Sequence, residues 1–154
     1  MRRDVTAGSS SVDRSNRRDH GRNLAKLFED DAEFVNVTGL WWHDRASIRK
    51  AHAFGLERIF NASTLSIDET RVKHLSPDVA VVHARMTLSG QTPIGKIRRP
   101  GSRTNVFSFV AHRVGVAWLC ASAHNTDVVP HLETNIVDDE GVFRAANYQN
   151  GLVS

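Results

Sequence analysis

Two strand-like segments decide the fold expected for this chain: FVNVTGLWW at residues 34–42 and WLCASAHNTD at residues 118–127. Both are apolar enough for the interior of a sheet, yet both carry polar side chains, among them Asn36 and His124. A buried polar group is costly unless it bonds to protein, water or a ligand. The two segments therefore predict a small-molecule site lined by a curved sheet.

The chain around these segments predicts helices first and hairpin-connected strands afterwards. A short helix is expected at 23–29 and a strand at 32–38, and Asp44 is a suitable N-cap for a longer helix whose apolar stripe runs from Ile48 to Phe60. The four strands expected after that helix lie at 64–75, 79–88, 104–112 and 116–128. This order predicts an α+β domain with an antiparallel sheet.

The 154 residues fit one domain between two polar segments. We expect residues 1–20 to form a polar, partly disordered leader, 21–129 to form the domain, and 130–154 to form a C-terminal extension. Residues 1–22 hold six arginines and three aspartates, so they account for the whole net charge of +3. Because the rest of the chain is neutral, no nucleic-acid-binding face is expected.

The sequence also favours a cytoplasmic location. No apolar run approaches the roughly 20 residues that a membrane-spanning helix needs, and the first residues lack the apolar region of a secretory signal. Cys120 is the only cysteine, which excludes an internal disulfide. Its apolar surroundings favour a small buried hydrophobe over a nucleophile.

Three histidines are the candidates for chemistry. Strand alternation places His83 and Arg85 on one face of their strand, and places His124 on the same face as Trp118 and Cys120. His52 lies in the middle of the apolar stripe of the long helix. If that helix covers the sheet, His52, His83 and His124 are expected to converge.

Several interpretations of this convergence stay open. The first is acid/base chemistry, with His124 and His83 transferring protons. Substrate-binding side chains would then be Asn36, Trp42, His52, Phe60, Arg85, Phe107 and Asn125. A three-histidine metal site is a weaker alternative, because no pair shows the short spacing of common ligand motifs. The remaining alternative is that each histidine is a hydrogen-bonded core residue.

Part of the chain resembles a known family. The residues concerned are LAKLFEDDAEFVNVTGLWW (24–42), then Arg45, Ile48 and His52, then PDVAVVHA (77–84), and Trp118 with AHNTD (123–127). This pattern, across residues 23–128, resembles the SgcJ/EcaC group, in the SnoaL-like branch of the nuclear-transport-factor-two-like superfamily. The resemblance implies a cone: a strongly curved antiparallel sheet wrapping N-terminal helices around a deep pocket, in a homodimer. Polyketide cyclases, ketosteroid isomerase, limonene epoxide hydrolase and scytalone dehydratase belong to the same superfamily.

Two departures from that pattern matter. Residues 11–20 lack the apolar stripe of the first helix in such domains, so a second copy or the C-terminal extension is expected to cover its place. The Asp/Tyr pairs of the isomerase and dehydratase are missing, since Tyr148 is the only tyrosine. No G-x-G-x-x-G follows a strand, so no nicotinamide or flavin cofactor is expected and an oxidoreductase reaction has no support.

The expected function is binding of a hydrophobic, oxygenated small molecule, such as a polyketide-like or aromatic metabolite of secondary metabolism. Isomerase, cyclase or dehydratase chemistry without a cofactor would use the same pocket. The alternative is a non-catalytic domain that binds or sequesters a ligand, or serves in association.

Overall fold

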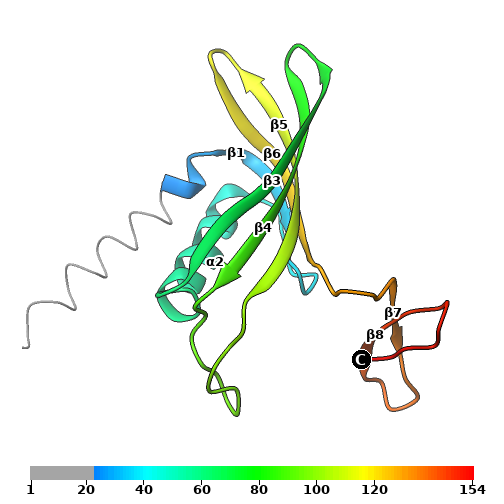
Figure 1. The fold of residues 1–154 in the computed structure, drawn as a ribbon. Helices are drawn as coiled ribbons and strands as arrows, with labels where there is room; N and C mark the ends of the chain where they lie inside the picture. The colour runs from blue at the N-terminus through cyan, green and yellow to red at the C-terminus, as the bar shows by residue number, and fades with distance from the viewer. Residues whose placement is uncertain (1–22) are drawn as a thin grey trace, which may run out of the picture.

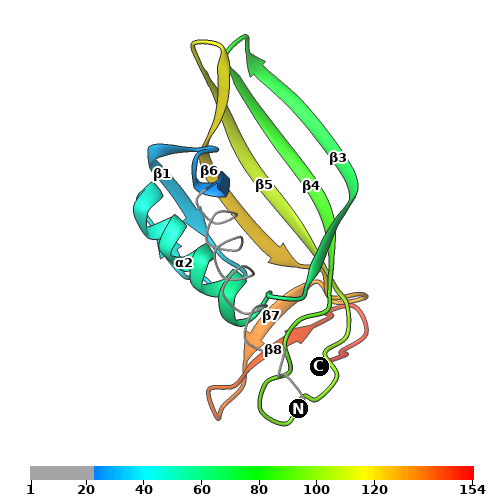
Figure 2. The same ribbon diagram turned by 90° about the vertical axis from the view of Figure 1, so that its left-hand side faces the viewer.

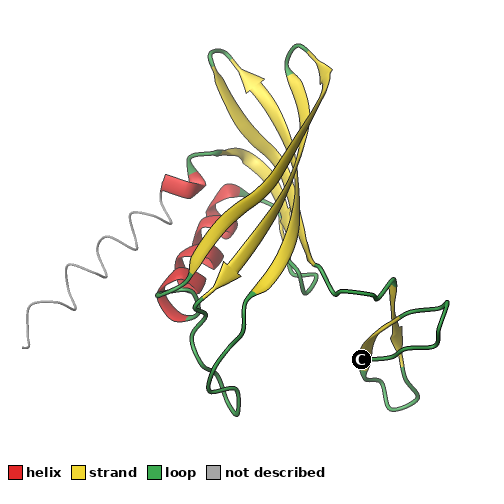
Figure 3. Cartoon of the chain, viewed as in Figure 1, coloured by secondary structure: helices red, strands yellow, loops and turns green. Residues whose placement is uncertain are grey.

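The computed structural model describes residues 23–154, and a large curved sheet with one long helix forms the body of this part (Figures 1 and 3). The helix is α2, Arg45–Arg58. The six strands of the sheet are β1 Phe28–Val35, β2 Trp41–Trp42, β3 Thr64–Ser76, β4 Val79–Ser89, β5 Arg103–Val114 and β6 Ala117–Asp127. Their spatial order is β2-β1-β6-β5-β4-β3. The architecture is therefore the expected α+β arrangement, with a mixed sheet.

The pairing of β1 with β6 corrects the expectation of an entirely antiparallel sheet. These two strands run parallel, with Phe34 opposite Ala123 and Val35 opposite His124. A parallel pair needs a long connection, and here α2 and the four strands β2, β3, β4 and β5 lie between β1 and β6 in the chain. The last strand thus returns beside the first and places residues 34–36 next to residues 123–125 in space.

Helix α2 begins where the sequence predicts. The Asp44 carboxylate accepts a hydrogen bond from the Ser47 N–H at 2.7 Å, which is an N-cap contact. That backbone bond holds the pKa of Asp44 below its usual value. Ile48 and Gly55 on the predicted stripe are buried, whereas Phe54, which lies off the stripe, is exposed. At the other end, the Ile59 and Phe60 N–H groups both donate to the Gly55 carbonyl.

The short helix expected at 23–29 is only one turn long. Residues 23–25 are helical, and strand β1 already starts at Phe28. Two of the apolar residues that suggested a helix contribute to the core instead, because Phe28 is buried and Leu24 packs against it, whereas Leu27 is exposed. The predicted disordered leader, residues 1–20, lies outside the described residues.

The core lies between α2 and one half of the sheet. Its buried members are Phe28, Ala32, Phe34, Ile48 and Ala123. Figure 2 shows α2 crossing the concave side of the sheet near β1 and β6, while β3 and β4 curve away from the helix. Register places Leu65, Ile67 and Val72 of β3 on this same concave face, opposite Leu88, Met86 and Val82. All three β3 side chains are exposed, Ile67 at 66%, so no described element covers this apolar wall.

A second, two-stranded sheet follows the body. Residues 130–154, which were expected to be a polar C-terminal extension, contain the antiparallel hairpin β7 Thr134–Val137 and β8 Phe143–Ala146. Among the described residues, no helix has the length and apolar character needed to cross a membrane.

Candidate functional site

His52 is held against the aromatic part of the concave core. Its ring lies edge-on to Phe34, with 5.0 Å between centroids, and 6.2 Å from the ring of Trp42. Nδ1 is 2.8 Å from the Ile48 carbonyl oxygen one turn earlier in α2. A carbonyl only accepts, so Nδ1 carries the proton in this bond. Nε2 has no partner among the described residues and is left as an acceptor.

Burial lowers the pKa of His52, and the bond to Ile48 opposes that shift only in part. Desolvation disfavours the charged imidazolium, which is the usual effect of an apolar environment on histidine. The side chain is therefore neutral near pH 7, with Nε2 free to accept a hydrogen bond or a proton. Such a group is suited to proton transfer and equally to holding a ligand hydroxyl.

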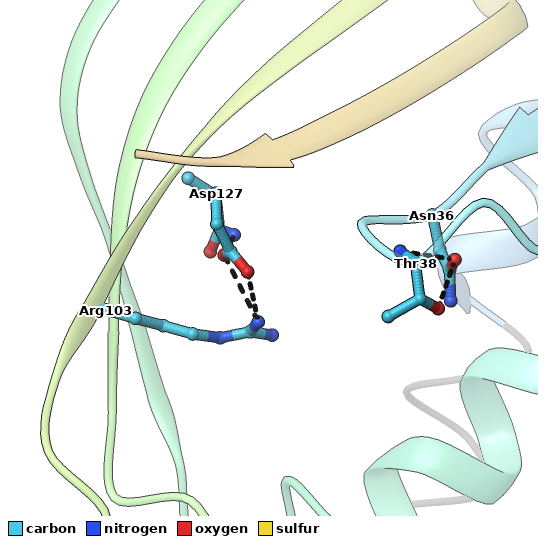
Figure 4. A network of polar contacts seen from close by, with 5 residues as sticks. Asn36, Thr38, Arg103 and Asp127 are labelled. Carbon is cyan, nitrogen blue, oxygen red and sulfur yellow. Dashed lines mark hydrogen bonds and ion pairs between the residues drawn. The ribbon is translucent and has the colours of Figure 1, made fainter. Parts of the chain in front are cut away.

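A polar cluster lies where β5 begins and β6 ends. Arg103 Nη1 donates to both carboxylate oxygens of Asp127, at 3.2 and 3.1 Å, and Asn105 Nδ2 donates to the same carboxylate. Asn105 is 2% exposed. Figure 4 shows the Arg103 side chain reaching from the sheet toward the side on which α2 lies, with Asp127 beside it. We call Arg103, Asn105, Asn125 and Asp127 the polar cluster.

Two buried atoms of the polar cluster lack a hydrogen-bond partner: Arg103 Nε and Asn125 Oδ1. Buried polar atoms are nearly always paired in proteins, and an unpaired one costs about 1–3 kcal/mol. One of these atoms is a donor and the other an acceptor, on neighbouring strands of one face. A ligand that reached both atoms would have to accept a hydrogen bond from Arg103 and donate one to Asn125. The polar cluster also has no net charge, because Arg103 is already paired with Asp127.

Apolar side chains of the sheet lie on the same face as the polar cluster. Phe107 pairs with Asn125 across the β5–β6 ladder, and its ring stacks on Phe109 with centroids 5.5 Å apart and planes 6° from parallel. Both rings pack against the core. Of the residues expected to bind substrate, Trp42, His52, Phe107 and Asn125 therefore lie on the concave face. Phe60 lies at the end of α2, where its ring packs over Gly55.

The Asn36 side chain was expected to contact substrate, but it stabilises a turn. Its Oδ1 accepts hydrogen bonds from Thr38 N, Thr38 Oγ1 and Leu40 N, at 3.0, 3.0 and 2.9 Å. These bonds hold the turn between β1 and β2, and Figure 4 shows the Asn36–Thr38 pair apart from the polar cluster. The polar group in this apolar segment is thus satisfied by the protein itself.

The expected convergence of His52, His83 and His124 is wrong. His83 and His124 both lie opposite Ser108 in the ladders, one on each side of it. His83, Ser108 and His124 form a row on the outer face of the sheet. The adjacent residue on each strand, Ala84, Phe107 or Ala123, faces the core. Both histidines are exposed, and Arg85 lies exposed on the same outer face. Only His52 lies on the concave side.

A β-bulge explains the error for His124. The register of β5 with β6 shifts between Val110 and Ala111, so that Val110 pairs with Ser122 and Ala111 with Cys120. Residue 121 is extra, and Cys120 therefore faces the core while Ser122 and His124 face outward. Burial raises the pKa of the Cys120 thiol to about 11. The thiol stays protonated, which agrees with its interpretation as a buried hydrophobe.

Sequence reasoning missed Arg103, Asn105 and Asp127. The strand alternation that places Asn125 and Asp127 on one face was a usable signal. Arg103 had been assigned to the connection between strands, whereas it begins β5. Its pairing with Asp127 depends on the register of two strands and has no local signature.

A separate surface pocket of about 600 Å³ lies at the start of α2, next to the first described residues. Its lining consists of Ala25, Lys26, Asp30, Asp44, Arg45, Ala46 and Arg49. Two of its polar groups already serve the fold, since Asp44 caps α2 and Arg45 bonds the Phe28 carbonyl. We therefore favour the polar cluster as the candidate site. Within residues 23–154, no group of three His, Cys, Asp or Glu side chains could hold a metal ion.

Comparison with known proteins shows the fold. No protein-family model matches the chain, and no curated protein sequence does. An uncharacterised protein with a cystatin-like fold from Caulobacter vibrioides superposes with a TM-score of 0.66 at 22% identity, over 78% of this chain and 82% of that one. A protein from Pseudomonas aeruginosa that is like nuclear transport factor two gives 0.57 at 18% identity, over 72% and 81%. A ketosteroid isomerase-like protein from Erwinia carotovora atroseptica gives 0.56 at 13%, over 78% and 92%.

The fold of this chain is cystatin-like, of the nuclear-transport-factor-two-like kind. The fold expected from the sequence is thus supported, in the form of a curved sheet with few helices. At these identities the likeness concerns the fold alone, and the site must be argued from this chain's own residues.

Proposed function

We propose that this protein binds a neutral, hydrophobic small molecule through a hydroxyl or enol group, in a cavity on the concave face of the sheet. The observation that carries the proposal is the pair of unpartnered buried atoms, Arg103 Nε and Asn125 Oδ1. A hydroxyl group accepts and donates at once, and so is matched to a donor and an acceptor on the same face. Aromatic or polyketide-like metabolites carry such groups on apolar frameworks.

The surroundings of the cluster support an apolar ligand body. The exposed β3 side chains Leu65, Ile67 and Val72 and the ring of Phe107 lie on the same face as the cluster. Exposed apolar surface of this kind, with a few polar groups, is typical of ligand sites. A carboxylate ligand fits less well, because the Arg103 guanidinium is already paired and the Asp127 carboxylate would repel an anion.

Acid/base catalysis is the finer part of the proposal. His52 is the proton acceptor that we assign to an isomerase, cyclase or dehydratase reaction, because its pKa is lowered and Nε2 is free. Asp127 and Asn125 would orient the reacting oxygen. His83 and His124 have no part in it.

The test is a fluorescence titration with three probes that share one ring system: 2-naphthol, 2-methoxynaphthalene and 2-naphthoate. We expect 2-naphthol to bind several-fold more tightly than the methyl ether, which has no hydrogen to donate, and more tightly than the anion. One neutral hydrogen bond corresponds to about 0.5–1.5 kcal/mol, or roughly 2- to 12-fold in affinity. Failure of all three probes to bind at saturating concentration would contradict the proposal.

Asn125→Leu and Asn105→Leu form a matched pair of variants. Asn125→Leu removes an unpaired buried acceptor, so we expect a gain in unfolding free energy of about 1 kcal/mol together with loss of the preference for 2-naphthol over its methyl ether. Asn105→Leu breaks a buried bond to Asp127 and should destabilise the fold by about 1–3 kcal/mol. A methyl ether that still binds less tightly than 2-naphthol to Asn125→Leu would remove Asn125 from the site.

A further inference from the structure

The C-terminal hairpin makes its contacts almost entirely within its own segment. Beyond the body, residues 130–154 form β7, β8 and a bridge between Ala146 and Val153. Among the described residues, no hydrogen bond or ion pair joins β7 or β8 to the six-stranded sheet or to α2. Figure 1 shows the hairpin standing off from the sheet. An isolated two-stranded hairpin is at best marginally stable in water, so we expect it to have a packing partner.

The hairpin exposes an apolar pair beside acidic side chains. Val137 and Phe143 are opposite one another in the ladder, and Phe143 is 70% exposed. The turn between them is held by Asp138, whose carboxylate accepts from the Glu140 and Val142 N–H groups and pairs with Arg144. Asp139 and Glu140 in the same turn are exposed and have no ion-pair partner among the described residues. We call residues 137–143 the acidic tip.

The connection between β4 and β5 exposes an apolar pair beside basic side chains. Ile94 and Ile97 bond to one another through both backbone N–H groups, at 3.2 and 3.0 Å, which makes a tight turn. Both side chains are exposed, Ile94 at 72%. Residues 90–102 contain no acidic side chain, and the cations beside the isoleucines form no ion pair with any described residue; they are Lys96, Arg98 and Arg99. We call residues 94–99 the basic tip.

We propose that the acidic tip of one chain docks on the basic tip of a second copy of this chain. Both tips lie at the same end of the body in the two views (Figures 1 and 2), yet within one chain no hydrogen bond or ion pair among the described residues joins them. In a two-fold arrangement each copy supplies one acidic tip and one basic tip. Two copies then satisfy both contacts, and the assembly is a closed dimer. The apolar pairs would lose water together, while opposite charges at their rims guide the approach.

A cross-linking experiment tests which chain supplies the partner tip. One chain carries Ile97→Cys and another carries Phe143→Cys, both with Cys120→Ala, so that a disulfide between tips can only form between chains. We expect a mixed disulfide dimer on mild oxidation. The control replaces Phe143→Cys by Val116→Cys, a fully exposed residue in the β5–β6 turn at the opposite end of the sheet, and should give none. A disulfide that forms only inside a chain carrying both cysteines overturns the proposal.

Charge exchange tests the same contact on the chain without added cysteines. Arg98→Glu with Arg99→Glu, or Asp139→Lys with Glu140→Lys, should each raise the dimer dissociation constant about tenfold, the effect of losing the exposed ion pairs at both tip contacts of the dimer. The protein carrying all four changes should recover most of that loss, as measured by sedimentation velocity. A monomeric wild-type chain at micromolar concentration, or no recovery in the fourfold variant, would overturn the proposal. Neither result bears on the binding of 2-naphthol.

Discussion

The concave and outer faces of the six-stranded sheet carry histidines of two different kinds. On the concave side His52 is surrounded by Phe34 and Trp42 and has a lowered pKa. On the outer side His83 and His124 flank Ser108 and are exposed. The three residues look alike in the sequence, since each lies in an apolar segment. The strand register turns His83 and His124 outward, whereas the place of His52 on the inner face of α2 gives it the burial that lowers its pKa.

The largest difference between the faces should appear in stability. Phe34→Ala removes a ring that is 4% exposed and contacts Phe28, Trp42 and His52, so we expect a loss of about 3–5 kcal/mol in unfolding free energy. Its neighbour Val35 points to the outer face and is half-buried. Val35→Ala should cost about 1 kcal/mol. Urea denaturation of both variants measures the contrast, and similar losses would mean that the core is not confined to the concave side.

The fold was largely predictable because its signals are local. Asp44 caps a helix whose stripe starts at Ile48, and four strands begin and end within about three residues of their expected positions. These features depend on neighbouring residues in the chain. The parallel pairing of β1 with β6 was missed because it joins segments that are about 90 residues apart.

The candidate site was less predictable for the same reason. Alternation assigned His124 to the face of Cys120, and the bulge at residue 121 reverses that relation. No residue type marks the bulge, because Ala121 is compatible with regular strand. The Arg103–Asp127 pair likewise follows from the β5–β6 register. One extra residue was enough to exchange the outer and inner side chains of half a strand.

A smaller effect should separate the histidines by pH. Burial lowers the pKa of His52 in the folded protein, so the unfolded chain takes up a proton first as the pH falls below about 6.5. The stability that neutral His52 contributes is therefore complete above that pH and is lost on acidification. We expect His52→Gln to lose less stability than the wild type between pH 7 and pH 5. The urea denaturation midpoint at each pH measures this loss. His124→Gln changes an exposed side chain and should keep the wild-type pH dependence; an equal effect of both variants would contradict the assignment.

The smallest effects on stability and ligand affinity are expected for His83 and His124 on the outer face. His83→Ala and His124→Ala each remove an exposed side chain for which no hydrogen bond is found within the described residues, so the unfolding free energy should change by less than about 0.5 kcal/mol. Neither substitution touches the concave face, and the affinity for 2-naphthol should stay within twofold of wild type. The titration is most informative for His124, because its neighbours Ala123 and Asn125 both face the core. Loss of 2-naphthol binding in His124→Ala, with an unchanged urea midpoint, would show that the ligand lies on the outer face and would return the proton-transfer role from His52 to His124.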